Sequence, residues 1–210
     1  MRIAVVGARG QLGAAVVQEY AERADVVALT RADVDVTDRA ALQARVAAEA
    51  PDILINCSAY NKVDAAEDEP VVAFATNALA VATLARAAAD AGAVFVHYST
   101  DFVFDGAASE PYTEIDAPNP RGTYAASKLI GEWLAAECPR HYVLRVESLF
   151  GGPRAKSSID RMLDGIIAGR AVPAFSDRTV SPSYVEDVIT AMMTLVDRQA
   201  PFGVYHCVNS

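Results

Sequence analysis

The sequence predicts an α/β fold in which a doubly wound parallel sheet carries helices on both faces. Short apolar runs, typical of parallel strands buried on both faces, alternate along the chain with longer segments of helical character. The first run, residues 3–6, stops at Gly7, and a helical segment follows it. The chain has 210 residues, of which 52% are hydrophobic, so it can bury the core of one domain, with or without a small appendage.

Each predicted element is marked by its own pattern. The strands are short runs rich in valine, isoleucine and leucine, and they occupy residues 3–6, 25–29, 53–56, 94–99, 142–146 and 204–208. The helices are longer and are marked by their ends. They occupy residues 11 to about 20, 38 to about 50, 70–91, 124 to about 137, 157–168 and 184–198.

Residues at four helix ends support these assignments. Thr37 or Asp38 can cap the second helix, because a side-chain oxygen there accepts from a free backbone N–H, and Pro51 ends that helix. Pro70 is tolerated in a first helical turn, and Gly92 is a natural residue to follow a last one. The alternation then divides the chain into a dinucleotide-binding domain with the catalytic residues at 1–150, and a partial substrate-binding lobe at 151–210 whose last strand returns to the main sheet.

Composition excludes several function classes. The chain has 18 Lys and Arg against 27 Asp and Glu, a net charge of −9, and no basic run, so we expect neither nucleic acid nor a membrane surface as a partner. No apolar run reaches membrane-spanning length and no signal peptide is evident. Three distant cysteines indicate a reducing compartment, so we expect a cytoplasmic protein. The three histidines, His97, His141 and His206, do not cluster, and we predict no metal site.

A glycine-rich loop joins the first strand to the first helix. It reads Gly7-Ala8-Arg9-Gly10-Gln11-Leu12-Gly13, a GxxGxxG spacing. Residues without a Cβ allow the sharp turn, and the free N–H groups at the helix start then face a bound pyrophosphate. The alternative is a tight turn without a ligand. The position of the loop in a βαβ series favours dinucleotide binding by Gly7, Arg9, Gly10, Gln11, Leu12 and Gly13.

The end of the second strand bears on which dinucleotide is bound. Arg31 follows that strand and Arg9 lies in the glycine loop, and two guanidinium groups suit the 2′-phosphate of NADP. The alternative is two solvated surface arginines. NADPH is therefore favoured, with NADH still open. Asp35 and Val36 are candidates to flank the adenine.

Three further residues suit the reduction of a carbonyl group. Tyr124 and Lys128 lie four apart on a predicted helix and share a face. An ammonium near a phenol lowers its pKa, which makes the phenol proton easier to transfer. Thr100 follows the fourth strand, at the sheet edge where open parallel sheets bind ligands, and its hydroxyl can bond the same substrate oxygen. We therefore predict Thr100, Tyr124 and Lys128 as catalytic residues; the alternative is an ordinary helix pair.

Over its whole length the chain resembles the dTDP-4-dehydrorhamnose reductase family of the extended short-chain dehydrogenase/reductase superfamily. The stretches that carry the resemblance are GARGQLG from Gly7, INCSAYNKVDAAEDEP from Ile55, HYSTDFVFDG from His97 and TYAASKLIGE from Thr123. The resemblance implies a Rossmann fold in which NADPH reduces the 4-keto group of a nucleotide-linked deoxysugar. It also implies that Tyr124 is the general acid, that Lys128 binds the nicotinamide ribose and that Thr100 orients the carbonyl.

The resemblance further implies a set of binding residues. Ala59, Tyr60 and Val63 would line the cofactor, while Phe102, Phe104, Arg145 and Arg178 are candidates for the nucleotide sugar, with Arg154 as a further candidate for its diphosphate. Asn77 either ties its helix to the active-site strand or is an ordinary helical asparagine. A homodimer is compatible with the family.

The chain departs from the family pattern in three places, the first of which is Ala125, where the family often carries glycine after the tyrosine. The family has a Thr-Ser-Trp-like run after its fifth strand, where this chain reads Glu147-Ser148-Leu149, and the family continues for a further segment after the last strand. Two other functions, an epimerase and a regulatory subunit, stay open, whereas the sequence argues against a dehydratase. A dehydratase would need two acids directly after Thr100, where the chain has only Asp101. An epimerase would use the same Thr, Tyr and Lys with a retained NAD, and a regulatory subunit would bind a dinucleotide without catalysis.

Overall fold

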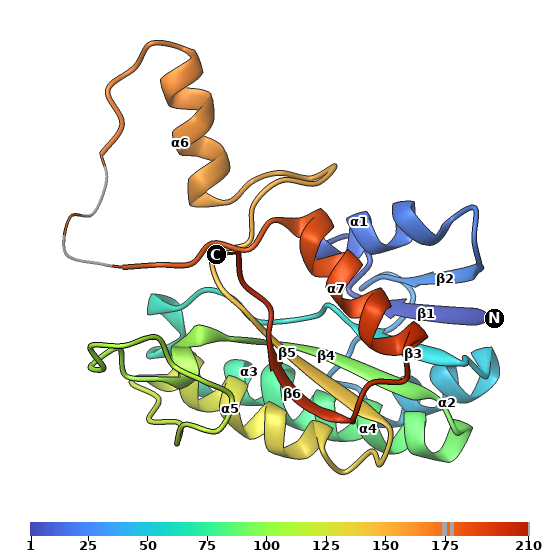
Figure 1. The fold of residues 1–210 in the computed structure, drawn as a ribbon. Coiled ribbons are helices and arrows are strands. Elements are labelled where there is room, and N and C mark those ends of the chain that lie inside the picture. Colours follow the sequence, from blue (N-terminus) through green and yellow to red (C-terminus); the bar gives the residue numbers. More distant parts are fainter. Residues whose placement is uncertain (174–175, 177–178, 210) are drawn as a thin grey trace.

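A single parallel sheet of six strands, in the order β2-β1-β3-β4-β5-β6, forms the centre of the computed structural model (Figure 1). The structure describes residues 1–173, 176 and 179–209. The strands are β1 (Arg2–Val6), β2 (Asp25–Leu29), β3 (Ile53–Asn56), β4 (Val94–Thr100), β5 (His141–Val146) and β6 (Gly203–His206). Every neighbouring pair is parallel. The predicted doubly wound α/β fold is confirmed.

The helices lie on both faces of the sheet. They are α1 (Gln11–Tyr20), α2 (Arg39–Glu49), α3 (Pro70–Phe74), α4 (Ala80–Ala91), α5 (Thr123–Ala135), α6 (Ser158–Ile167) and α7 (Val185–Asp197). One buried cluster joins α1 and α7 to one face of the sheet, and a second joins α2, α4 and α5 to the other. Because β1 lies between β2 and β3, the chain crosses to opposite sides after β1 and after β2, which leaves a crevice at the carboxyl ends of β1 and β3.

Residues at three helix ends make the capping contacts, or adopt the backbone conformation, expected of their types. Asp38, rather than Thr37, caps α2, since its carboxylate accepts from the backbone N–H of Ala41. Ser157 and Asp160 form a capping box at the start of α6. Gly92 follows α4 with a φ of +67°, the left-handed conformation that favours glycine.

The helix predicted over residues 70–91 is continuous but irregular. Between α3 and α4 it widens into a π-helical turn, η2 (Ala75–Leu79). Among the described residues, this 22-residue helix is the one long and apolar enough to cross a membrane by length and composition, so the expectation that no apolar run reaches that length is wrong. More than half of its most apolar stretch is buried within the fold, and core helices of soluble proteins pass the same test.

The segment after β5 is only partly packed against the sheet. Figure 1 shows α6 standing away from the sheet, whereas α7 returns to it and β6 pairs with β5 at the sheet edge. The proposed division between a dinucleotide-binding part at 1–150 and a substrate lobe at 151–210 stays a prediction.

A buried ion pair joins α5 to β5. Arg145 donates from Nε and Nη2 to the two carboxylate oxygens of Glu132, at 2.9 and 2.7 Å. Both side chains are almost fully buried, at 6% and 3% exposure. The guanidinium carbon also lies 5.0 Å from the centre of the Phe104 ring. Each charge in this pair therefore depends on the other for its solvation.

Removing one of these charges should be costly. We expect Glu132→Gln to lower the free energy of unfolding by about 3 kcal/mol, because the Arg145 guanidinium then stays buried without a counter-charge. Glu137→Gln is the matched control, since Glu137 pairs with Arg86 at an exposed site of neighbouring helices. Its cost should be below about 1 kcal/mol. Urea unfolding monitored by circular dichroism checks both, and equal costs would contradict the expectation.

Candidate active site

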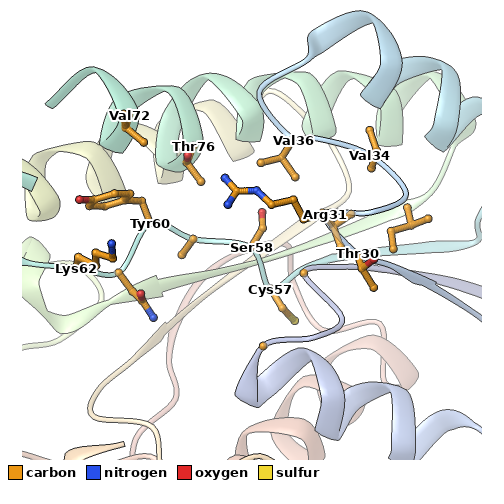
Figure 2. A pocket seen from close by; sticks show the side chains of 16 residues that line it. Thr30, Arg31, Val34, Val36, Cys57, Ser58, Tyr60, Lys62, Val72 and Thr76 are labelled. Atoms are coloured by element: carbon orange, nitrogen blue, oxygen red, sulfur yellow. The ribbon is translucent and has the colours of Figure 1, made fainter. Parts of the chain in front are cut away.

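A cavity of about 400 Å³ lies at the crevice between β1 and β3 (Figure 2). Its walls come from the glycine loop, from the segment after β2, from the segment after β3 and from α3 and η2. The lining residues include Gly7, Gly10, Thr30, Arg31, Val34, Val36, Cys57, Ser58, Ala59, Tyr60, Lys62, Val72 and Thr76. Six of them, namely Gly7, Gly10, Arg31, Val36, Ala59 and Tyr60, were predicted from the sequence to bind the cofactor.

Two glycines of the loop, Gly7 and Gly13, have no room for a side chain. Gly7 has a φ of +79°, and a Cβ there would lie 2.7 Å from the backbone nitrogen of Ser58. A Cβ on Gly13 would lie 2.4 Å from the carbonyl oxygen of Gly7. Gly10 begins α1 without a side-chain cap, so the first N–H groups of the helix are free to bind an anion. The loop therefore fits the pyrophosphate of a dinucleotide.

Other predicted residues of this loop have different contacts. The side-chain amide of Gln11 donates to the carbonyl oxygen of Gly151 at 3.0 Å and to Asp160 at 3.1 Å, so it ties the loop to the segment before α6. Leu12 is buried in the core against the sheet. Arg9 is exposed, and its carbonyl oxygen accepts from Arg154 at 3.0 Å.

The segment after β2 contributes one charged residue to the cavity. In Figure 2 the Arg31 side chain extends between Val36 and Ser58. Asp35 is exposed and lies outside the cavity lining. Its carboxylate accepts from the backbone N–H and the hydroxyl of Thr37, and these bonds lower its pKa. Asp35 thus stabilises the turn before α2, and the structure shows no contact of its side chain with the cavity.

The segment after β3 is held in place by one buried side chain. The Asn77 amide, in η2, accepts from the backbone N–H of Tyr60 at 2.8 Å and donates to the Tyr60 carbonyl at 2.9 Å. The same amide donates to the Ser127 hydroxyl on α5 at 3.0 Å. Asn77 therefore ties the cavity wall to the helix that carries Tyr124. Val63 lies outside the lining, at the start of the next turn, and is 40% exposed.

Thr100, Tyr124 and Lys128 come from β4 and α5, outside the cavity lining. Thr100 ends β4, and Tyr124 lies in the first turn of α5, where the Thr100 hydroxyl acts to lower the pKa of the phenol. The Lys128 ammonium, one turn further along α5, is buried and donates to the Tyr98 carbonyl of β4 at 2.6 Å. The exposed ring of Phe102 packs edge-on against Tyr124, with 5.9 Å between the ring centres.

The electrostatics of this trio differ from the sequence-based expectation. Burial raises the pKa of Tyr124 to about 12, the nearby Asp101 carboxylate raises it too, and the bond to Thr100 lowers it. Lys128 is not among the groups that act on the phenol. Burial lowers the pKa of Lys128 itself to about 8, while the carboxylate of Glu132 raises it. The lysine is therefore close to losing its charge near neutral pH.

The predicted sugar-nucleotide residues separate in the structure. Phe102 borders the catalytic trio, but Phe104 is buried and stacks on Tyr112 with ring centres 4.2 Å apart. Arg145 is buried in its pair with Glu132, so its guanidinium is engaged within the fold and does not face a diphosphate site. Arg178 lies outside the described residues. Within the described ranges, no three His, Cys, Asp or Glu side chains gather as a metal site.

Some lining residues were not predicted from the sequence. Ser58, Lys62 and Thr76 face the cavity. The one sequence signal for them is their position, directly after the third strand or in the helix that follows it. Cys57 also lines the cavity, and burial raises the pKa of its thiol to about 12, so the thiol stays protonated.

A glycine loop at the switch point of a parallel sheet, with a Thr-Tyr-Lys trio beside it, defines a dinucleotide-binding protein of the short-chain dehydrogenase/reductase type. The family model described as "RmlD substrate binding domain" matches residues 1–210. The chain belongs to this family, and the resemblance seen in the sequence is confirmed.

Named relatives agree with this assignment. A dTDP-4-dehydrorhamnose reductase of Mycobacterium tuberculosis is 39% identical over 215 residues, which cover 99% of this chain and 70% of the relative. One from Sinorhizobium fredii is 35% identical and covers 100% and 73%. A crystal structure of the Bacillus anthracis dTDP-4-dehydrorhamnose reductase in complex with NADP superposes with a TM-score of 0.93 at 32% identity, covering 100% of this chain and 75% of that one.

The lowered pKa of Lys128 makes the stability of the protein depend on pH. The unfolded lysine keeps its proton up to about pH 10.5, whereas the folded one loses it near pH 8. Between these values the unfolded state binds more protons, so this group adds stability as the pH rises. We expect Lys128→Met to remove about 1.5 kcal/mol of the gain in unfolding free energy between pH 8 and 9.5. Lys62→Met, at an exposed lysine, should keep the wild-type change of unfolding free energy with pH, as measured by urea unfolding. If Lys128→Met showed that same change with pH, the lowered pKa of Lys128 would be refuted.

Proposed function

We propose that this chain reduces the 4-keto group of dTDP-4-dehydrorhamnose to give dTDP-L-rhamnose, with NADPH as cofactor. The observation that carries the proposal is a cavity suited to a dinucleotide at the carboxyl end of β3, next to β4, which ends in Thr100 and whose Tyr98 carbonyl holds Lys128 of α5. The names of the relatives supply the substrate. A cytoplasmic location and a homodimer remain predictions.

The cavity suits NADPH in two ways. The free N–H groups at the start of α1 would hold the pyrophosphate, and Arg31 would pair with the 2′-phosphate of the adenosine ribose. When bound, NADPH supplies the hydride that reduces the carbonyl carbon.

The residues of the chain supply alignment and the proton. The Tyr124 hydroxyl donates its proton to the carbonyl oxygen as negative charge develops there. The Thr100 hydroxyl, at the carboxyl end of β4, would hold the same oxygen. The Lys128 ammonium is fixed by the Tyr98 carbonyl and would hold the ribose of the nicotinamide half of the cofactor. Phe102, packed edge-on against Tyr124, covers one side of this ring.

Replacing Tyr124 should impair turnover and leave cofactor binding nearly unchanged. We expect the protein to oxidise NADPH when given dTDP-4-dehydro-6-deoxy-L-mannose, and Tyr124→Phe to lower kcat at least about 100-fold because the proton donor is lost. The dissociation constant of NADPH should change less than about twofold, since the ring remains. Absorbance at 340 nm measures turnover, and fluorescence titration measures binding. Absence of turnover in a wild-type protein that binds NADPH would refute the reductase proposal, and tightly retained NAD would favour an epimerase.

Arg31 should set the choice of cofactor. We expect Arg31→Ala to weaken NADPH binding about tenfold while leaving NADH binding unchanged, because only NADPH carries the 2′-phosphate. Arg23→Ala serves as the control, since Arg23 is an exposed arginine paired with Glu19 away from the cavity. Fluorescence titrations with both dinucleotides test the expectation. An equal loss for NADPH and NADH would instead place Arg31 at the shared part of the cofactor.

A further inference from the structure

A serine in the wall of the dinucleotide cavity is held by the strand that precedes it. Ser58 lines the cavity two residues after Asn56, the last residue of β3. The side-chain oxygen of Asn56 accepts from the backbone N–H of Ser58 at 3.0 Å and from its hydroxyl at 2.6 Å. Asn56 is 1% exposed, so water does not compete for these bonds. The Ser58 side chain is therefore fixed from the core side of the cavity.

The amide nitrogen of Asn56 is bound to a histidine of the next strand. Asn56 and His97 are register partners on β3 and β4, and Asn56 Nδ2 lies 3.1 Å from His97 Nδ1. The backbone N–H of Ser58 can only donate, so the amide oxygen faces Ser58 and the amide nitrogen faces His97. That nitrogen also can only donate, so Nδ1 accepts and the neutral ring carries its proton on Nε2. Burial keeps the ring neutral, because it holds the pKa of His97 well below its ordinary value.

This tautomer is not the one that the surroundings of the histidine would select. Among the described residues, His97 Nε2 has no hydrogen-bond partner, although the side chain is fully buried. A buried N–H without an acceptor is destabilising. The tautomer is therefore imposed by Asn56, whose orientation is set by Ser58. The three side chains form one line in which Ser58 donates to Asn56 and Asn56 donates to His97.

The direction of this line decides what the Ser58 hydroxyl offers to a ligand. A hydroxyl has one proton to donate and two lone pairs that accept. The proton of Ser58 is committed to the Asn56 oxygen, which has no proton of its own. Only the lone pairs of Ser58 Oγ remain for the cavity. A ligand group that bonds this oxygen must therefore be a hydroxyl or an N–H, because a phosphate oxygen without a proton would meet lone pairs alone.

The neighbours of Ser58 indicate which part of a dinucleotide lies against it. A Cβ on Gly7 would lie 2.7 Å from the Ser58 backbone nitrogen, so Ser58 is directly beside the glycine loop. In Figure 2 the Ser58 hydroxyl points toward the side chain of Arg31, and both residues line the same cavity. Arg31 is the residue expected at the 2′-phosphate of the adenosine ribose. The hydroxyl donor adjacent to that phosphate, on the same ribose, is the 3′-hydroxyl.

We propose that Asn56, oriented against His97, holds the Ser58 hydroxyl as an acceptor for the 3′-hydroxyl of the adenosine ribose. This inference rests on the proposed function, because it concerns the same cofactor. Ser58 is then a binding residue, whereas Asn56 and His97 are positioning residues that do not touch the cofactor. NADPH and NADH both carry this hydroxyl, so Ser58 supports the binding of both, and the discrimination between them is left to Arg31.

Binding of adenosine 2′,5′-bisphosphate and of its 3′-deoxy analogue to the whole chain tests the contact at Ser58. We expect Ser58→Ala to weaken binding of the bisphosphate about fivefold and to leave binding of the 3′-deoxy analogue unchanged, because only the first ligand carries the donor. Ser109→Ala, at an exposed serine outside the cavity lining, should bind both ligands as the wild type does. Calorimetric titration measures each affinity. An equal loss for both ligands, or no loss for either, overturns the proposal.

A double variant tests the role of Asn56. Asn56→Leu should weaken binding of the bisphosphate about as much as Ser58→Ala does, because the freed hydroxyl is no longer oriented. Adding Ser58→Ala to Asn56→Leu should then cause little further loss, since the two residues act as a unit. Losses that add in full would show that Asn56 does not act through Ser58.

Nitrogen NMR of labelled histidine tests the same line in the wild type, so it does not depend on the folding of a variant. His97 should carry its proton on Nε2, with Nδ1 bare. Its signals are recognised as those that persist in both His141→Gln and His206→Gln. A proton on Nδ1 overturns the proposed positioning, whatever the affinities are. A wild type that binds neither NADPH nor the bisphosphate overturns the proposed function, and the contact at Ser58 with it.

Discussion

The geometry of the site depends on the side-chain amide of Asn77. It satisfies both backbone groups of Tyr60 and one hydroxyl of α5, so a single group joins the dinucleotide cavity to the catalytic helix. Asn77 is 1% exposed, so any of these bonds left unmade would leave a buried polar group unsatisfied. The π turn that carries Asn77 also approaches α5 closely. A Cβ on Gly131 would lie 2.2 Å from the Asn77 carbonyl oxygen, so only glycine allows this approach.

Burial governs the electrostatics around this framework. The chain is acidic overall, yet it buries two positive groups, Lys128 of α5 and Arg145 of β5. Lys128 is bound to a carbonyl oxygen and lies one helical turn from Glu132, which in turn holds Arg145. These two positive groups are therefore held by acceptors within the fold, and neither acts on the Tyr124 phenol. The charge that does act on it is the carboxylate of Asp101, which together with burial raises the pKa of Tyr124.

The parts of this structure that depend on local sequence could be predicted, and those that depend on contacts between distant segments could not. Every strand was predicted to within two residues at each end, because parallel strands buried on both faces need continuous apolar runs. The glycine loop and the Tyr124-Lys128 spacing are equally local. The pairing of Arg145 with Glu132 joins a strand and a helix, and no spacing rule distinguishes it from a substrate-binding arginine. Asp35 was expected at the cofactor, but an aspartate before a helix serves a turn equally well.

The bond of Gln11 to the segment before α6 has a consequence for how this protein could be rebuilt. The backbone of the glycine loop faces the dinucleotide, while the Gln11 side chain holds Gly151 and Asp160. A chimaera that takes residues after β5 from another relative would therefore need a matching acceptor at position 160. Without that acceptor, the exchange would remove a hydrogen bond that holds Gln11, although the glycine loop itself lies outside the exchanged segment. A junction for exchanging the substrate lobe is therefore better placed after α6 than at the end of β5.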